Sequence, residues 1–120
     1  MNIIDVTDRD FDRVIAEHNL IVIDFWATWC GPCQSFKKVV ATVAKKYSNV
    51  LFANVDIDTE IKLAAEFHIQ SVPSIMILRN QVVVFAESGA LTVSALSELI
   101  RQAQALDPEQ LKAAADKENE

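Results

Sequence analysis

Apolar and polar positions along the chain follow two patterns, one typical of buried strands and one of amphipathic helices. The stretch "LIVIDFWA" (20–27) is a continuous apolar run, as strands buried on both faces are, and "NVLFANVDI" (49–57) is predicted to be a second strand. The stretches "SIMIL" (74–78) and "QVVVFAE" (81–87) are separated by only two residues, which predicts an antiparallel hairpin.

Helical periodicity fills the segments around these strands, with apolar residues on one face and charged residues, lysines in the second helix, on the other. The predicted helices cover residues 5–19, 34–47, 58–67 and 91–106. The expected N-caps are Thr7 for the first helix, Asp58 or Thr59 for the third and Thr92 for the fourth. Because helices alternate with strands before a hairpin and a closing helix, we expect an α/β domain with a mixed sheet and helices on both faces.

Residues 107–120, "DPEQLKAAADKENE", stand apart from the domain predicted for residues 1–106. Residues 107–110 can form a capping box, with Pro108 at the first helical position. The apolar side chains of this tail are only Leu111 and alanines, which favours a solvated tail, partly helical or disordered, over a segment that docks on the domain.

The charge of the chain excludes several classes of partner. With 11 Lys and Arg against 17 Asp and Glu, the net charge is −6, whereas nucleic-acid binding and polybasic membrane contacts both need clustered basic residues. The N-terminal "MNIIDVTDRD" does not resemble a signal peptide, and no apolar run reaches the roughly 20 residues that span a bilayer. We therefore expect a cytoplasmic protein that binds neither nucleic acid nor membrane. Stable structural disulfides are rare in that compartment, so the two cysteines are expected to be catalytic or metal-binding.

Both cysteines lie in "FWATWCGPCQSF" (25–36), between a predicted strand and a predicted helix. Backbone N–H groups at a helix N-terminus favour negative charge, so the pKa of a thiol there is expected to fall below its free value of about 8.5. Cys30 lies at the turn and should be the more exposed, which makes it the candidate nucleophile; Cys33, inside the first helical turn, is the candidate resolving thiol. Gly31 is expected to allow a tight turn and Pro32 to stiffen the loop.

Other interpretations of the cysteine pair are a zinc site, an iron–sulfur cluster and a pair of ordinary buried thiols. Zinc needs four ligands, and neither His18 nor His68 lies at finger-like spacing from the cysteines. Iron–sulfur clusters normally take four cysteines. The strand–turn–helix context favours a thiol–disulfide couple, so no metal is expected.

Two further residues interrupt the apolar pattern. Asp24 lies inside the first apolar strand, where a carboxylate is costly unless paired and tends to take up a proton. It could serve as a base and proton store for Cys33, or it could be hydrogen-bonded to a neighbouring loop. Pro73 precedes an apolar strand and is either an ordinary trans proline or a cis proline in a tight turn.

Taken together, these residues resemble the thioredoxin family. The resemblance rests on "FWATWCGPC", the upstream Asp24, Val72-Pro73 and the "SGA" of residues 88–90, and it covers most of the chain from about residue 3 to about residue 106. It implies a thioredoxin-like fold, in which a central mixed five-stranded sheet is flanked by about four helices.

The resemblance also implies a mechanism and a set of site residues. Cys30 would attack a substrate disulfide, Cys33 would resolve the mixed disulfide, Asp24 would aid proton transfer, and Pro73 would be cis. The implied substrate-binding residues are Trp29, Gly31, Pro32, Val72, Pro73, Gly89 and Ala90.

The function implied by the resemblance is that of a protein-disulfide reductase. It would be a monomer without a cofactor other than the redox-active Cys30–Cys33 disulfide. An NADPH-dependent thioredoxin reductase would donate the electrons, and client proteins with disulfides would accept them. One alternative is a binding or redox-chaperone module that uses the same groove with little turnover. Another is a disulfide oxidase or isomerase, although the lack of a signal peptide speaks against it.

The chain departs from the family pattern in several places, among them Ser71-Val72-Pro73-Ser74, where Gly-Ile-Pro-Thr is usual. Lys38 stands where the second helix commonly has a kinking proline. Asn54 stands where a lysine often faces the buried acid, and Asn80-Gln81 replaces the usual Asn-Gly of the hairpin. None of these departures removes a catalytic group.

Overall fold

The structure, a computed structural model, describes residues 2–118 and has five strands and five helices in that range. The strands are β1 (Ile3–Asp5), β2 (Leu20–Trp26), β3 (Leu51–Asp56), β4 (Ser74–Arg79) and β5 (Val82–Ser88). The helices are α1 (Phe11–Glu17), α2 (Gly31–Lys46), α3 (Ile61–Glu66), α4 (Val93–Ala105) and α5 (Pro108–Glu118). The sheet order is β1-β3-β2-β4-β5, with β1, β3 and β2 parallel and β4 and β5 antiparallel to their neighbours. The expected α/β fold with a mixed five-stranded sheet is confirmed.

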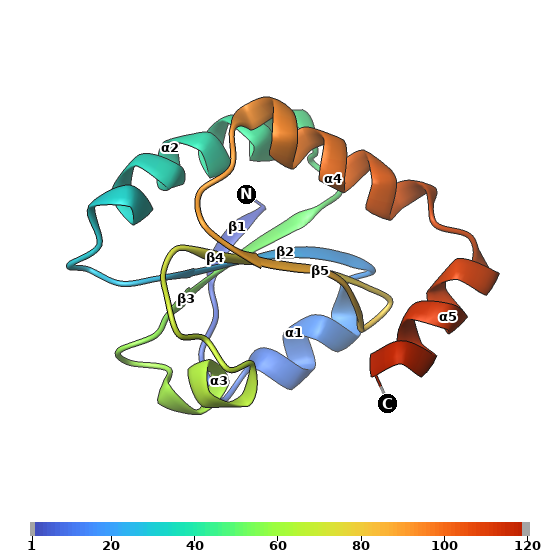
Figure 1. Ribbon diagram of the computed structural model, residues 1–120, viewed down its shortest axis with the longest axis horizontal. Helices are drawn as coiled ribbons and strands as arrows, with labels where there is room; N and C mark the ends of the chain where they lie inside the picture. Colours follow the sequence, from blue (N-terminus) through green and yellow to red (C-terminus); the bar gives the residue numbers. More distant parts are fainter. Residues whose placement is uncertain (1, 119–120) are drawn as a thin grey trace.

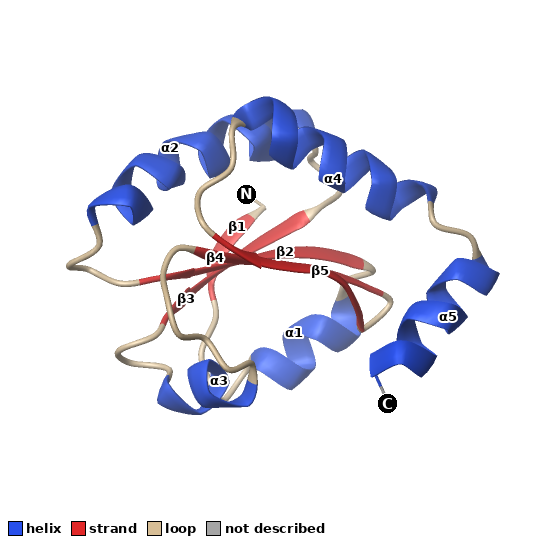
Figure 2. Cartoon of the chain, viewed as in Figure 1, coloured by secondary structure: helices blue, strands red, loops and turns tan. Residues whose placement is uncertain are grey.

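Helices cover both faces of the sheet, with α2 and α4 on one face and α1 and α3 on the other (Figures 1 and 2). The side chains of β2 alternate between these two layers because a strand has a two-residue period. Val22 packs in the core with α2 and α4, whereas Ile21 and Ile23 pack with α1 and α3. Asp24 follows Val22 by two residues and therefore faces α2 and α4.

The N-terminal segment differs from the expected helix over residues 5–19. It begins with β1, whose Ile3 packs against one core and whose Ile4 packs against the other. A strand points two adjacent isoleucines to opposite faces of the sheet, which a helix does not do. Thr7 is not the N-cap of α1, which is Asp10; instead its N–H and hydroxyl donate to Asp10 Oδ1 at 2.7 and 3.1 Å in the preceding turn.

The cap expected for α3 at Asp58 or Thr59 is also wrong. The N-cap is Glu60, whose side chain makes no capping hydrogen bond. The carboxylate of Asp8, far away in sequence, accepts the first-turn N–H of Leu63 at 2.9 Å. A distant acid therefore satisfies this helix end and leaves Asp58 for another partner, described below.

The predictions for α2, α4 and the hairpin agree with the structure. Phe36, Val40 and Val43 are buried on the inner face of α2. Thr92 caps α4, and its hydroxyl oxygen accepts the N–H of Ala95 at 3.1 Å. Strands β4 and β5 pair antiparallel. These elements had the clearest periodicity in the sequence.

The tail of the chain forms α5 with the predicted capping box. The N–H of Asp107 donates to Gln110 Oε1 at 2.9 Å, and the N–H of Gln110 donates to Asp107 Oδ1 at 2.8 Å. Pro108 is the first helical residue, where its missing N–H costs no helical hydrogen bond.

Helix α5 packs on the domain rather than standing free in solvent, so the expectation of a solvated tail is wrong for its inner face. It lies beside β5 (Figure 1), and Leu111 is only 9% exposed. At the joint before α5, Arg79 Nη1 donates to the carbonyl oxygen of Ala103 at 2.9 Å and to that of Leu106. The end of β4 is thereby tied to the end of α4.

Replacing Gln81 with glycine is expected to stabilise the protein. Asn80 and Gln81 have φ angles of 50° and 66°, so both central residues of the hairpin turn are left-handed. This turn favours Asn-Gly because glycine adopts positive φ without a steric penalty. We expect Gln81→Gly to raise the free energy of unfolding by about 1 kcal/mol in urea titrations. Gln104→Gly, in the exposed face of α4, should lower it by about the same amount; a loss with Gln81→Gly would contradict the turn assignment.

Leu111→Ala is expected to destabilise the fold without affecting thiol–disulfide exchange. The change removes a buried leucine side chain, which typically costs about 2 kcal/mol. Helix α5 lies at the end of the molecule opposite the start of α2 (Figure 1). Urea unfolding should therefore shift while the rate of disulfide reduction stays the same. Lys112→Ala, at the neighbouring exposed position, is the control; unchanged stability in Leu111→Ala would show that α5 does not contribute to the fold.

Candidate active site

The two cysteines form a disulfide at the point where β2 ends and α2 begins. Cys30 is the N-cap of α2, Cys33 lies in its first turn, and their Cα atoms are 5.3 Å apart. Cys30 is 4% exposed and Cys33 is 0% exposed. The order of exposure agrees with the sequence analysis, but the candidate nucleophile is more deeply covered than its position in a turn suggested.

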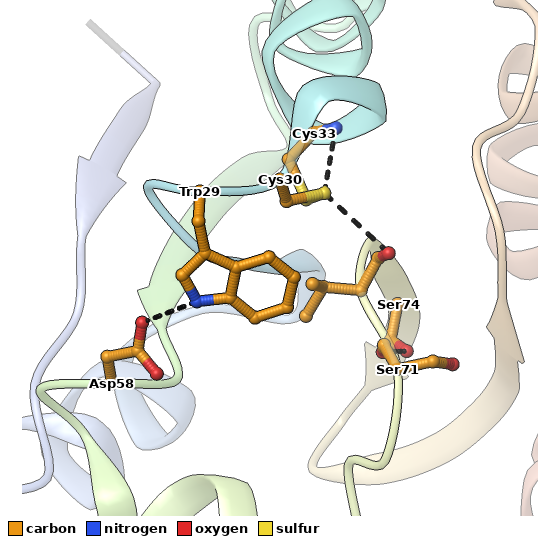
Figure 3. Close-up of a disulfide and its surroundings, with 7 residues drawn as sticks. Trp29, Cys30, Cys33, Asp58, Ser71 and Ser74 are labelled. Atoms are coloured by element: carbon orange, nitrogen blue, oxygen red, sulfur yellow. Dashed lines mark hydrogen bonds between the residues drawn. A yellow bond between two sulfur atoms is a disulfide. The ribbon is translucent and has the colours of Figure 1, made fainter.

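The N-terminal end of α2 donates a hydrogen bond to the sulfur of Cys30. The backbone N–H of Cys33 lies 3.1 Å from Cys30 Sγ (Figure 3). When the disulfide is reduced, this N–H and the positive end of the helix dipole stabilise a thiolate at Cys30. Cys33 itself lies inside the turn and is closed off from solvent.

Gly31 and Pro32 form the exposed first turn of α2. Gly31 is the first residue of α2, directly after the N-cap Cys30. A Cβ at Gly31 would meet no atom within 4 Å. Glycine here leaves the helix end uncovered, and Pro32 loses no helical hydrogen bond because first-turn N–H groups have no helical partner.

A second loop brings Val72 and Pro73 against the cysteines. The Val72–Pro73 peptide bond is cis, which confirms one of the two alternatives left open by the sequence. The carbonyl oxygen of Val72 lies 3.7 Å from Cys30 Sγ (Figure 3). In the disulfide this sulfur carries no proton, whereas a reduced Cys30 thiol can donate to that oxygen. Ser74 Oγ donates to the carbonyl oxygen of Ser71 at 2.6 Å and closes the loop.

A third segment, residues 88–90, joins the same site. The N–H of Gly89 donates to the carbonyl oxygen of Pro73 at 2.8 Å. Gly89 has a φ angle of +107°, which side chains rarely allow, so this position requires glycine. Ala90 follows in an exposed position. The Gly89 hydrogen bond thus joins this segment to the Pro73 loop, and the Val72 carbonyl oxygen of that loop lies beside Cys30.

Trp29 projects beside the disulfide. It is 70% exposed, and its Nε1 donates to Asp58 Oδ2 at 3.0 Å (Figure 3). The hydrogen bond fixes one edge of the indole while leaving most of its surface open. Sequence reasoning assigned Asp58 to a helix cap and therefore missed it as the partner that orients Trp29.

Asp24 is buried without a hydrogen-bond partner. It is 2% exposed, and neither carboxylate oxygen is hydrogen-bonded to any described residue. The interpretation as a carboxylate bonded to a neighbouring loop is therefore wrong. Burial raises its pKa from 3.8 to about 7, and the positive charge of Lys37 opposes part of that rise. Near neutral pH this carboxyl group can both hold and release a proton.

Lys37 is a residue that sequence reasoning placed on the solvent side of α2. Its Nζ instead lies 3.6 Å from the centre of the Trp26 ring. The spacing in the sequence could have indicated this position of Lys37. It follows Cys33 by four residues and so lies on the same side of the helix.

The described residues show no metal centre and no membrane span. Within residues 2–118, no cluster of three or more His, Cys, Asp or Glu side chains is arranged to hold a metal ion. None of the helices in that range combines the length and apolar character that a bilayer crossing needs.

A dithiol–disulfide pair at a helix N-terminus, faced by a cis proline and backed by a buried carboxyl group, defines a thiol–disulfide oxidoreductase. Comparison with known proteins gives the family. The thioredoxin family model matches residues 2–102. "Putative thioredoxin 2" of Streptomyces coelicolor is 40% identical over 111 residues, covering 92% of this chain and 83% of that protein. A "Bifunctional thioredoxin reductase/thioredoxin" of Mycobacterium leprae is 33% identical over 103 residues, 22% of its own length.

The similarity extends to three dimensions. A solved structure, a mutant thioredoxin from Halobacterium salinarum, superposes with a TM-score of 0.81 at 29% identity, covering 89% of this chain and 95% of that one. The chain belongs to the thioredoxin family, which confirms the resemblance seen in the sequence, the thioredoxin-like fold and a thiol–disulfide oxidoreductase function.

Substitution of Asp24 by asparagine is expected to change how stability depends on pH. Below about pH 4 the carboxyl is protonated in the folded and unfolded chains, whereas between about pH 4 and 7 only the folded chain holds the proton. The contribution of Asp24 to the free energy of unfolding therefore falls as pH rises, by about 1.4 kcal/mol per unit and on the order of 4 kcal/mol in all. Asp24→Asn lacks this loss. Its free energy of unfolding, measured in urea titrations, should therefore rise relative to that of the wild type between pH 5 and pH 8.

The matched control is Asp116→Asn, which alters an exposed carboxylate in α5. The free energy of unfolding of this variant should change between pH 5 and pH 8 by the same amount as that of the wild type. A constant difference between the wild type and Asp24→Asn across the range would show that Asp24 has an ordinary pKa.

Proposed function

We propose that this protein is a protein-disulfide reductase in which Cys30 is the nucleophile and Cys33 the resolving thiol. The observation that carries the assignment is the hydrogen bond from the Cys33 N–H to Cys30 Sγ. It stabilises negative charge on one sulfur of the pair, and that sulfur is the one with some exposure to solvent.

The exchange proceeds in two balanced steps. The Cys30 thiolate attacks one sulfur of a client disulfide, forms a mixed disulfide and releases the other client sulfur as a thiolate that takes up a proton. Cys33 then loses its proton and attacks Cys30 Sγ, which forms the Cys30–Cys33 disulfide and releases the second client thiolate. The client gains two electrons and the protein loses two.

Asp24 is proposed as the base for the second step. It faces α2, the helix that carries Cys33, and its pKa of about 7 suits proton transfer near neutral pH. The ionised carboxylate accepts the Cys33 proton as the thiol becomes a nucleophile. Burial of both groups keeps competing water from the reaction.

The client chain is proposed to bind along the rim around Cys30. Val72, Pro73, Gly89 and Ala90 form one side, and Trp29 forms the other. Gly31 and Pro32 expose a helix end without bulky polar side chains, so a client backbone can approach the sulfur.

The thioredoxin family implies a thioredoxin reductase and disulfide-containing clients as partners in general. For this chain we propose an NADPH-dependent reductase as the donor, which the Mycobacterium leprae protein supports because its name joins a reductase to a thioredoxin. We further propose that the protein works in the cytoplasm as a monomeric electron carrier and that the cysteine pair is its only redox group. Membership of the family favours an oxidoreductase over a binding or redox-chaperone module.

The assignment of the two cysteines predicts which variant traps clients. Cys33→Ser keeps the nucleophile but cannot resolve, so it should accumulate dithiothreitol-sensitive complexes with disulfide-containing proteins on non-reducing gels. Cys30→Ser should trap almost none because Cys33 is fully buried. Equal trapping by the two variants would overturn the roles.

A second measurement separates a reductase from the other candidate functions. With NADPH and a thioredoxin reductase, the wild type should reduce insulin disulfides, followed as NADPH oxidation, and both serine variants should not. A binding module would give no turnover, and an oxidase would instead introduce disulfides into a reduced peptide.

A further inference from the structure

We infer that Asp8 is a positioning residue for client binding, because it fixes the start of α3 and thereby the orientation of Trp29. The link runs through the segment between β3 and α3, residues 57–60, which carries Asp58. The role rests on the proposed function, in which Trp29 forms one side of the rim that receives the client chain. It gives a task in disulfide exchange to the loop between β1 and α1, which lies outside the site described above.

The joint between Asp8 and α3 consists of hydrogen bonds in both directions. The N–H of Asp8 donates to Glu60 Oε1 at 3.0 Å. The carboxylate of Asp8 accepts the N–H of Leu63 at 2.9 Å and that of Lys62 at 3.4 Å. A capping box makes such an exchange within one helix end, whereas here Asp8 and Glu60 are 52 residues apart in sequence. The joint therefore fastens the start of α3 to a distant loop.

Helix α3 depends on this joint because it has little support of its own. It has only six residues, and helices of that length are not stable in water without tertiary contacts. Its N-cap, Glu60, makes no capping hydrogen bond. Leu63 is 3% exposed, so water has little access to replace Asp8 as the acceptor of its N–H. Without the Asp8 carboxylate, the first turn of α3 would have to shift or fray.

The segment before α3 transmits the position of the helix start to Asp58. The second carboxylate oxygen of Glu60 accepts the hydroxyl of Thr59 at 2.6 Å, and the N–H of Glu60 donates to the carbonyl oxygen of Asp56 at 2.8 Å. The N–H of Asp58 donates to Asp56 Oδ1 at 2.9 Å. Asp56 is the last residue of β3. The sheet thus fixes one end of the segment, and Asp8 fixes the other.

Trp29 depends on this segment for its orientation. With 70% of the residue exposed, packing restrains the ring little, and its Nε1 donates to Asp58 Oδ2 at 3.0 Å (Figure 3). A side chain already held in its bound orientation loses less freedom when a partner binds, so less of the binding energy is spent on ordering it. A change at Asp8 should therefore weaken the binding of a client chain and leave the reactivity of the sulfurs unchanged.

The test uses Asp8→Ala, with Asp8→Asn as the conservative variant and Asp10→Ala as the matched control. The amide oxygen of asparagine can still accept the N–H of Leu63. Asp10 is a half-buried carboxylate of the same loop, like Asp8, but it accepts the N–H and hydroxyl of Thr7. Glu60→Ala is a second test of the joint, because it removes the acceptor of the Asp8 N–H and leaves the Asp8 carboxylate in place.

The first readout is the indole N–H resonance of Trp29 in ¹H–¹⁵N spectra of the full oxidised chain. Loss of the hydrogen bond to Asp58 moves this proton upfield. Asp8→Ala and Glu60→Ala should shift it toward the position seen in Asp58→Ala, whereas Asp8→Asn and Asp10→Ala should leave it near the wild-type position. The indole N–H of Trp26 serves as the internal reference and should not move.

The second readout compares a protein client with a small disulfide. With thioredoxin reductase and NADPH, Asp8→Ala should lower kcat/KM for insulin about fivefold, mainly through KM. Its rate with hydroxyethyl disulfide, which is too small to reach along the rim, should equal that of the wild type. In an Asp58→Ala background, Asp8→Ala should lower kcat/KM for insulin no further, because the two residues act on Trp29 in series.

Each outcome decides a separate point. An unmoved Trp29 resonance in Asp8→Ala would overturn the inference, even if urea titrations showed a loss of stability, because Asp8 would then only support α3. Equal shifts in Asp8→Ala and Asp10→Ala would overturn it as well. Should Asp8→Ala not fold, Glu60→Ala decides by the same resonance. A wild type that reduced neither substrate would contradict the proposed function, while the resonance would still test the joint.

Discussion

Strand β2 is hydrogen-bonded on both sides and covered by helices on both faces, and this isolation from water governs the chemistry of the site. Residues 21–25 are all buried, so a carboxyl group placed among them must exist without solvent. At the end of the same strand the chain leaves the sheet and enters α2, whose first N–H groups face outward. A buried acid and a polar helix end are thereby held within one short stretch of chain, and the two cysteines lie at that helix end.

The remaining parts of the site depend on this arrangement and come from separate places in the sequence. The Pro73 loop supplies a carbonyl oxygen beside Cys30, and Gly89 holds that loop through its own N–H. Asp58 orients Trp29 from the segment before α3. Each of these contacts uses backbone groups or a single side chain.

The sequence predicted the elements with strong periodicity and the residues with unusual chemistry in an apolar context. It identified β2, α2, α4, the hairpin, the cysteine pair and Asp24 as the features that matter. It failed where tertiary contacts decide the outcome. Three residues were enough for β1 because the partly buried Ile3 and Ile4 pack against the cores on opposite faces, and the end of α3 is satisfied by Asp8 from another part of the chain. No local pattern contains either fact.

The sequence also could not show which lysine of α2 faces the sheet. Lys37 and Lys38 are neighbours with the same chemistry, yet one lies over an indole ring and the other faces solvent. A helical period of 3.6 residues separates their directions by about 100°. Whether that difference brings a cation to a buried acid depends on how α2 crosses the sheet, which only the assembled fold determines.

Helix α5 also changes what the protein presents to other copies of itself. Edge strands can recruit a strand from another chain and so start aggregation. One edge here is β1, only three residues long, and the other is β5, beside which α5 packs through Leu111. With a net charge of −6 to keep copies apart, neither edge offers a long, flat surface for strand addition. The tail thereby favours colloidal stability, because strands of other chains find little open edge to pair with.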